Sequence, residues 1–133
     1  MRRRFVIWGI FLVSTFPVIA AEQAISVTPY YEIEDPFTIN FLRQSEQQAK
    51  YLQIKVALKS DDPEIIAHAA THLPMIQDSL RLLFSDQDMT KISSIEGRQS
   101  LQSEAFDVIN EIFVSELNNA NLQEIYFTRF IWQ

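Results

Sequence analysis

The last twelve residues limit the fold of this chain more than any other segment. Residues 122–133 contain no glycine or proline and are rich in β-branched and aromatic residues, which is typical of a β-strand. Both faces of this strand are largely apolar, because Ile125, Phe127 and Ile131 alternate with a second set that is mostly aromatic. Such a strand is predicted to lie in the middle of a sheet that helices cover on at least one side.

Further strands are predicted in the first half of the chain. Phe37 to Leu42 alternates apolar with polar residues, and Tyr51 to Leu58 alternates still more cleanly. Tyr30 to Ile33 is also β-prone, and the polar stretch from Arg43 to Lys50 is expected to be a connecting loop. The simplest arrangement pairs the two alternating strands in antiparallel orientation.

Three helices are predicted between these strands and the last one. Asp62 before Pro63 is a typical N-cap, and Pro74 ends the first helix and starts the second. The third helix is expected from about Ile95 to Leu117, with a capping box formed by Ser93 and Glu96. The expected buried stripes are Ile66, Ala69, Ala70 and Leu73 in the first helix, Ile76, Leu80, Leu83 and Phe84 in the second, and Leu101, Ala105, Ile109, Ile112 and Phe113 in the third.

This order of elements predicts an α+β fold. A small, mainly antiparallel sheet of about three or four strands packs against three helices. Ser85 to Lys91 is expected to be a polar break, and the asparagine-rich residues 118–121 are expected to end the third helix.

The N-terminus is predicted to be an export or anchoring segment. A positive cluster is followed by 17 uncharged residues, Phe5 to Ala21. As a signal peptide, the segment would be cleaved between Ala20 and Ala21; as an anchor, it has about the minimum length of a membrane-spanning helix. Both readings place the rest of the chain on the periplasmic side. The residues that carry them are Arg2, Arg3, Arg4, Trp8, Pro17, Val18, Ala20 and Ala21.

Residues 1–21 are therefore assigned to the leader, 22–29 to a short connector and 30–133 to one domain. Without the three leader arginines the chain has eight basic and 17 acidic residues, which argues against nucleic-acid binding. Cysteine is absent, so neither disulfides nor thiol chemistry are possible. The glycines are Gly9 and Gly97, too few for a phosphate-binding loop.

Candidate catalytic groups are few. His68 and His72 are four residues apart, a spacing that suits one metal ion, but Ala69 stands where a zincin has its glutamate and no third ligand follows at a diagnostic spacing. Both histidines are expected on a solvated helix face. No serine lies in a nucleophile elbow. We therefore predict that the chain is not an enzyme and has no metal site and no cofactor.

Several short motifs resemble one known family. The terminal run Tyr126-Phe127-Thr128-Arg129-Phe130-Ile131-Trp132-Gln133 is similar to the closing signature of the flagellar basal-body-associated FliL family. Other stretches match in order along residues 30–133: the first alternating strand, a Pro-x-Ile-x-Asp helix start, a Glu-Gly-Arg-x-x-Leu motif and a later asparagine. The residues that match are Asn40, Pro74, Asp78, Glu96, Gly97, Leu101, Asn110, Tyr126, Phe127, Thr128, Phe130 and Gln133.

The resemblance implies a function that the residue patterns do not show by themselves. FliL proteins are single-pass inner-membrane proteins with a periplasmic domain similar to the stomatin/prohibitin fold. They form rings around MotA/MotB-type stator units and support flagellar rotation, motility and chemotactic swimming. The short apolar run and short connector depart from the family pattern, as expected of a divergent paralogue. An exported adaptor of another envelope complex is the alternative.

Overall fold

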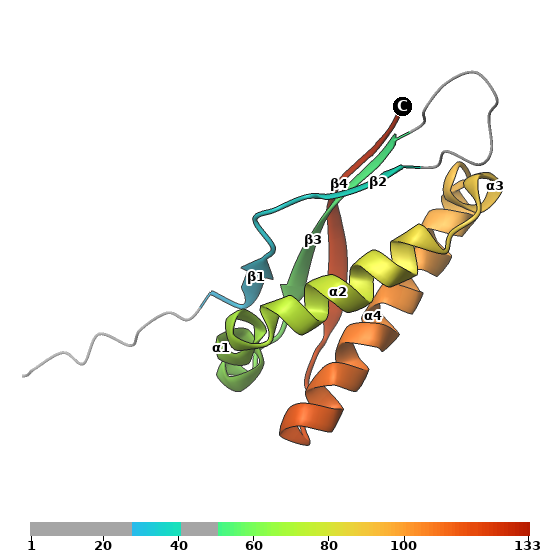
Figure 1. The fold of residues 1–133 in the computed structure, drawn as a ribbon. Helices are drawn as coiled ribbons and strands as arrows, with labels where there is room; N and C mark the ends of the chain where they lie inside the picture. The colour runs from blue at the N-terminus through green and yellow to red at the C-terminus, as the bar shows by residue number, and fades with distance from the viewer. Residues whose placement is uncertain (1–27, 41–50) are drawn as a thin grey trace, which may run out of the picture.

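The computed structural model describes residues 28–40 and 51–133 (Figure 1). The leader, most of the connector and the predicted loop at 43–50 lie outside these residues, as does the end of the strand predicted to reach Leu42. The elements in chain order are β1 (Tyr30–Glu32), β2 (Phe37–Asn40), β3 (Tyr51–Lys59), α1 (Pro63–Thr71), α2 (Leu73–Ser85), α3 (Met89–Ile92), α4 (Ile95–Leu117) and β4 (Glu124–Trp132). The predicted α+β class is confirmed.

The sheet is built around β3. All of its pairings are antiparallel: β2 pairs with residues 51–54 of β3, β1 pairs with residues 57–59, and β4 runs along the whole strand. Because a strand has two edges, β1 and β2 share one edge of β3, and β4 occupies the other. The prediction that the last strand lies in the middle of the sheet is therefore wrong; the middle strand is β3.

A bulge explains why β4 has apolar residues on both alternation phases. The register with β3 shifts between Lys55 and Val56. On β4 the shift separates Phe127, which pairs with Val56, from Phe130, which pairs with Ile54. Cross-strand partners share a face of the sheet, so Phe127 and Phe130 both lie on the face that carries the buried side chains of β3.

The helices cover one face of the sheet (Figure 1). The core lies between the layers, where Ile54 and Leu58 of β3 meet Ile76 and Leu80 of α2 and Ile109 of α4, all fully buried. The buried stripes of α2 and α4 agree with prediction, except that Leu83 is only partly buried. Where the chain is described, no helix is both long and apolar enough to cross a membrane.

Three helix details differ from prediction. In α1 Ala69 is buried as predicted, but the second buried residue is Ile65 and not the expected Ile66, and Ala70 is exposed. A short additional helix, α3, lies in and just beyond the predicted polar break, because the Asp88 side chain accepts a hydrogen bond from the Thr90 amide and caps it. The N-cap of α4 is Ser94, one residue later than predicted.

Candidate functional site

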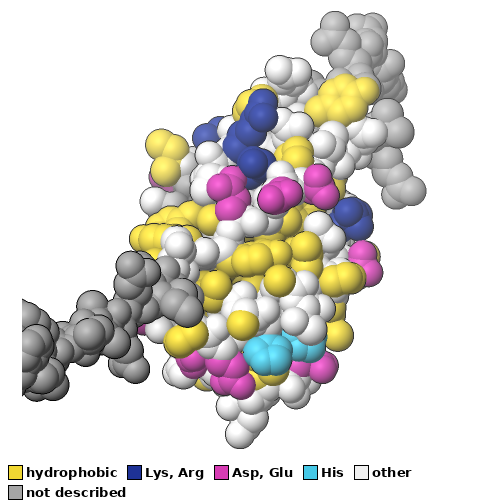
Figure 2. Space-filling model, turned by 90° about the vertical axis from the view of Figure 1, so that its left-hand side faces the viewer, with side chains coloured by type: hydrophobic (Ala, Val, Ile, Leu, Met, Phe, Trp, Pro, Cys, Tyr) yellow, Lys and Arg dark blue, Asp and Glu magenta, His cyan; other side chains and the backbone are white. Residues whose placement is uncertain are grey.

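His68 and His72 lie side by side at the C-terminal end of α1, where Figure 2 shows both histidine side chains at the surface. Their ring centroids are 5.8 Å apart and the rings are stacked. Both residues are partly buried, and Nδ1 of His68 is buried without a hydrogen-bond partner. The predicted solvated face is therefore only partly correct, because the actual Ile65–Ala69 stripe brings these residues to the boundary of the buried face. In residues 28–40 and 51–133 no group of three or more His, Cys, Asp or Glu could hold a metal ion.

A polar cluster ties the start of α1 to the segment between α4 and β4. The Asn119 amide donates to the carboxylates of Asp62, at 2.8 Å, and Glu64, at 2.6 Å. The Asn121 amide also donates to Asp62, at 2.8 Å, and the Ser60 hydroxyl donates to the Asn121 carbonyl. Asp62 is the N-cap of α1, as predicted, and accepts from the Glu64 amide. These acidic groups accept hydrogen bonds from side-chain amides, so the cluster links α1 to the segment before β4 and stabilises the fold.

The cluster makes the stability of the domain sensitive to acid. Hydrogen bonds from Asn121, Asn119 and the Glu64 amide hold the pKa of Asp62 below its usual value. The hydrogen bond from Lys91 does the same to the pKa of Glu104. A carboxylate with a lowered folded-state pKa stabilises the fold above the unfolded pKa, roughly 4, and that contribution is lost as the pH falls through the folded pKa.

We therefore expect the urea midpoint of the domain to fall as the pH is lowered below about 5. The Asp62→Asn variant should be less stable at pH 7 and should lose less of its stability on acidification, because its side chain carries no charge. Urea unfolding followed by circular dichroism at several pH values measures both effects. Asp107→Asn, on the exposed surface of α4, is the control and should follow the parent chain. Equal pH dependence in Asp62→Asn and the parent would contradict the assignment.

Gly97 lies where α3 meets the start of α4. Its amide donates to the hydroxyl of the Ser94 cap at 2.9 Å. A Cβ atom built on Gly97 would lie 1.6 Å from the Lys91 carbonyl oxygen, so no other residue fits without a backbone shift. Next to it, Glu96 lies in the first turn, where a negative charge is favourable. Gly97 of the Glu-Gly-Arg motif therefore allows the start of α4 to pack closely against α3.

Arg98 extends the same junction to the sheet. Its Nε donates to the Ile92 carbonyl at 3.1 Å, and its guanidinium lies 4.8 Å from the centre of the Phe130 ring. One side chain thus joins α3, α4 and β4.

The closing signature is also largely structural. Phe127 packs edge-to-face on Phe84, with centroids 5.9 Å apart, and Gln133 exchanges two backbone hydrogen bonds with Tyr51. The Tyr126 hydroxyl donates to Glu124, which raises the pKa of Tyr126 to about 12. Thr128 is exposed on the bulged part of β4.

The remaining motif residues are spread over the domain. Asn40 ends β2 opposite Tyr51, Pro74 is the second residue of α2, and Leu101 is fully buried. Asp78 is exposed and pairs with Arg81 at 3.3 Å, whereas Oδ1 of Asn110 is buried without a hydrogen-bond partner. The structure does not bring these residues together into one site.

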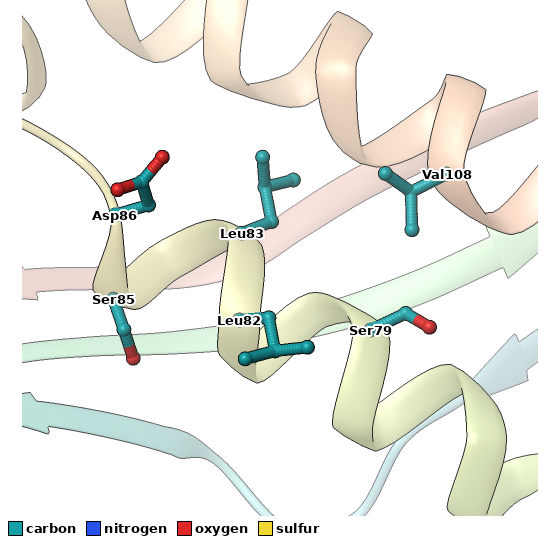
Figure 3. A pocket seen from close by; sticks show the side chains of 6 residues that line it. All are labelled: Ser79, Leu82, Leu83, Ser85, Asp86 and Val108. Atoms are coloured by element: carbon teal, nitrogen blue, oxygen red, sulfur yellow. The ribbon is translucent and has the colours of Figure 1, made fainter.

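A groove with apolar residues lies between α2 and α4 and is here called the α2–α4 groove. One hollow of about 550 Å³ is lined by Ser79, Leu82, Leu83, Ser85, Asp86 and Val108. A second, of about 260 Å³, shares Ser79 and Val108 and continues along Met75, Glu111, Ile112, Ser115 and Glu116. Figure 3 shows Leu83 and Val108 in the space between the two helices, with the sheet behind them. Leu82 is 74% exposed. Sequence patterning missed this surface, although Leu82 stands outside the buried stripe of its helix.

Comparison with known proteins agrees with the motifs. The model of the family "Flagellar basal body-associated protein FliL" matches residues 30–133. The chain belongs to the FliL family. Flagellar protein FliL of Escherichia coli K12 is 25% identical over 111 residues, which cover 84% of this chain and 70% of that protein. Flagellar protein LafL of Vibrio parahaemolyticus is 22% identical over 120 residues, or 90% and 71% of the two chains.

Membership of the FliL family makes this a flagellar basal-body-associated protein of the cell envelope. FliL is a family of structural flagellar proteins and not of enzymes, and this agrees with the prediction that the chain is not an enzyme.

Proposed function

We propose that this FliL protein associates with flagellar stator units on the periplasmic side of the inner membrane and thereby supports rotation, motility and chemotactic swimming. The observation that carries the proposal is the match of the FliL family over residues 30–133. The described surface supports a binding role, because it carries an open groove with exposed apolar side chains between α2 and α4.

The partners in this proposal are MotA/MotB-type stator proteins, the basal body and further copies of the chain in a ring. A ring that contacts one conformation of a stator unit more extensively than the others raises the population of that conformation. Closed rings arise when each copy offers two different surfaces to its neighbours.

The leader sets where the domain works. A retained Phe5–Ala21 segment would hold the domain at the membrane, whereas cleavage after Ala20 would release it into the periplasm. The N-terminal sequence of the mature protein from fractionated cells separates the two cases. A start at Ala21 or Glu22 in the soluble fraction means cleavage, and an intact chain in the membrane fraction means an anchor.

Deletion of the gene should reduce swimming and swarming while filaments remain. The reduction should be greatest in viscous medium, because stator units must stay engaged under load. Swimming speed and swarm diameter measure the effect, and filament staining together with complementation by the full chain is the control. Normal motility under high load would contradict the proposed function.

A further inference from the structure

The α2–α4 groove has the geometry of a receptor for a third helix. Its lining residues on α2 fall at positions 75, 79, 82, 83 and 85, with the C-cap Asp86 after them, and those on α4 fall at 108, 111, 112, 115 and 116. Steps of three and four residues form the ridges between which the side chains of another helix pack. The lined part of α2 spans about 16 Å at 1.5 Å per residue, which matches roughly three turns of a partner helix.

The floor of the groove is apolar and accessible. Leu82 is 74% exposed and Met75 is 44% exposed, while Val108 and Leu83 are partly buried. Leu83 packs partly against the core, and Ile76, Leu80 and Phe84 are the buried side chains of this helix, so Leu82 and Met75 are left exposed. Covering them would remove apolar surface from water, which favours binding.

The rim of the groove is acidic. Asp86 lies at one end, and Glu111 and Glu116 lie at the other. None of the three forms an ion pair with another residue of the described part of the chain. A partner with cationic groups beside its apolar stripe would therefore be favoured, both in steering and in the bound state.

The described helices of a second copy do not provide such a partner. Their lysine and arginine residues are Arg81, Lys91 and Arg98. Arg81 is paired with Asp78, Lys91 with Glu104, and Arg98 lies on Phe130. Charge complementarity therefore favours a helix of a different protein over a described helix of a second copy.

We propose that the α2–α4 groove binds an amphipathic helix of another protein whose apolar stripe is flanked by lysine or arginine. The helix is assigned to a stator unit, and only in that respect does the inference rest on the proposed function.

Photo-crosslinking in motile cells tests the proposal. A benzoylphenylalanine is placed at Leu82 of the full chain, and the matched control carries it at Ile95, which is 70% exposed and does not line the groove. Mass spectrometry of the crosslinked peptide should identify a segment with apolar residues at i, i+3 or i+4, and i+7, flanked by basic residues. A crosslink to a second copy, to an acidic or non-helical segment, or no excess over Ile95 would overturn the proposal.

The same result separates the two proposals. A basic amphipathic helix from a protein outside the stator would support the groove assignment and count against the stator as partner. A crosslink to an extended stator segment would support the stator as partner and contradict the assignment of the groove to a helix.

Binding measurements then test the chemistry. A synthetic peptide of the crosslinked segment is titrated into the purified full chain by fluorescence anisotropy. Leu82→Glu should raise Kd about tenfold or more, while Ile95→Glu should change it less than about twofold. The double variant Glu111→Lys with Glu116→Lys should weaken binding and reduce its salt dependence. Far-UV circular dichroism confirms that each variant is folded. Unchanged affinity in folded Leu82→Glu would overturn the proposal.

Discussion

Replacing Gly97 with alanine should lower the free energy of unfolding by about 3 kcal/mol and the Tm by roughly 15 °C. The new Cβ atom would lie 1.6 Å from the Lys91 carbonyl oxygen, well inside contact distance. That oxygen belongs to the backbone of α3, so the overlap is relieved only if α3 moves away from the start of α4. Such a movement would also disturb the hydrogen bond from Arg98 to the Ile92 carbonyl.

Thermal unfolding of the purified chain measures this effect, and two variants act as controls. Ser94→Ala removes the side chain that caps α4 and should cost about 1 kcal/mol, which is the loss expected from the cap alone. Ser103→Ala, on the exposed face of the same helix, should change stability by less than about 0.5 kcal/mol. If Gly97→Ala is no worse than Ser94→Ala, steric overlap is not the reason for a glycine at this position.

The role of Gly97 could not be predicted from the sequence alone. The Glu-Gly-Arg motif marked the position, but the reason for the glycine depends on α3. Residues 85–91 had been predicted to be a polar break, and the Asp88 cap allows the four-residue helix α3 to form there. A helix this short has too little periodicity to be recognised from its residues alone.

The sheet, too, could be predicted only in part from the sequence. The alternation of β2 and β3 gave both strands and their antiparallel pairing, because each has one clearly apolar face. In β4, apolar residues on both phases pointed to a central strand, whereas the structure has an edge strand with a bulge. A bulge shifts which residues share a face without changing the composition, so composition alone could not locate it.

The groove depends on the packing of two helices, so the sequence could indicate only that single residues such as Leu82 lie outside the buried stripe. Leu82 lies outside the predicted stripe of α2, and an exposed leucine taken singly is unremarkable. Only the approach of α4 places Val108 in the same hollow as Leu82 and brings Ile112 into the adjoining hollow.

Phe84→Ala should destabilise the domain by about 3–5 kcal/mol, although Leu82→Ala, two residues away, should change stability by less than about 0.5 kcal/mol. Phe84 is fully buried and meets Phe37 of β2 edge-to-face at 5.3 Å and Phe127 of β4 at 5.9 Å. Removing its ring leaves a cavity between α2 and both of these strands, and the aromatic contacts are lost as well.

Chemical unfolding of the two variants and of Phe84→Leu tests this contrast. Phe84→Leu keeps most of the apolar volume and should fall between Phe84→Ala and the parent chain. Peptide binding at the groove should show the opposite order: Leu82→Glu weakens it in a folded protein, whereas Phe84→Leu leaves it largely unchanged as long as α2 stays in place. A large stability loss in Leu82→Ala would mean that this side chain belongs to the core, and the groove would then be part of the fold and not a surface for a partner.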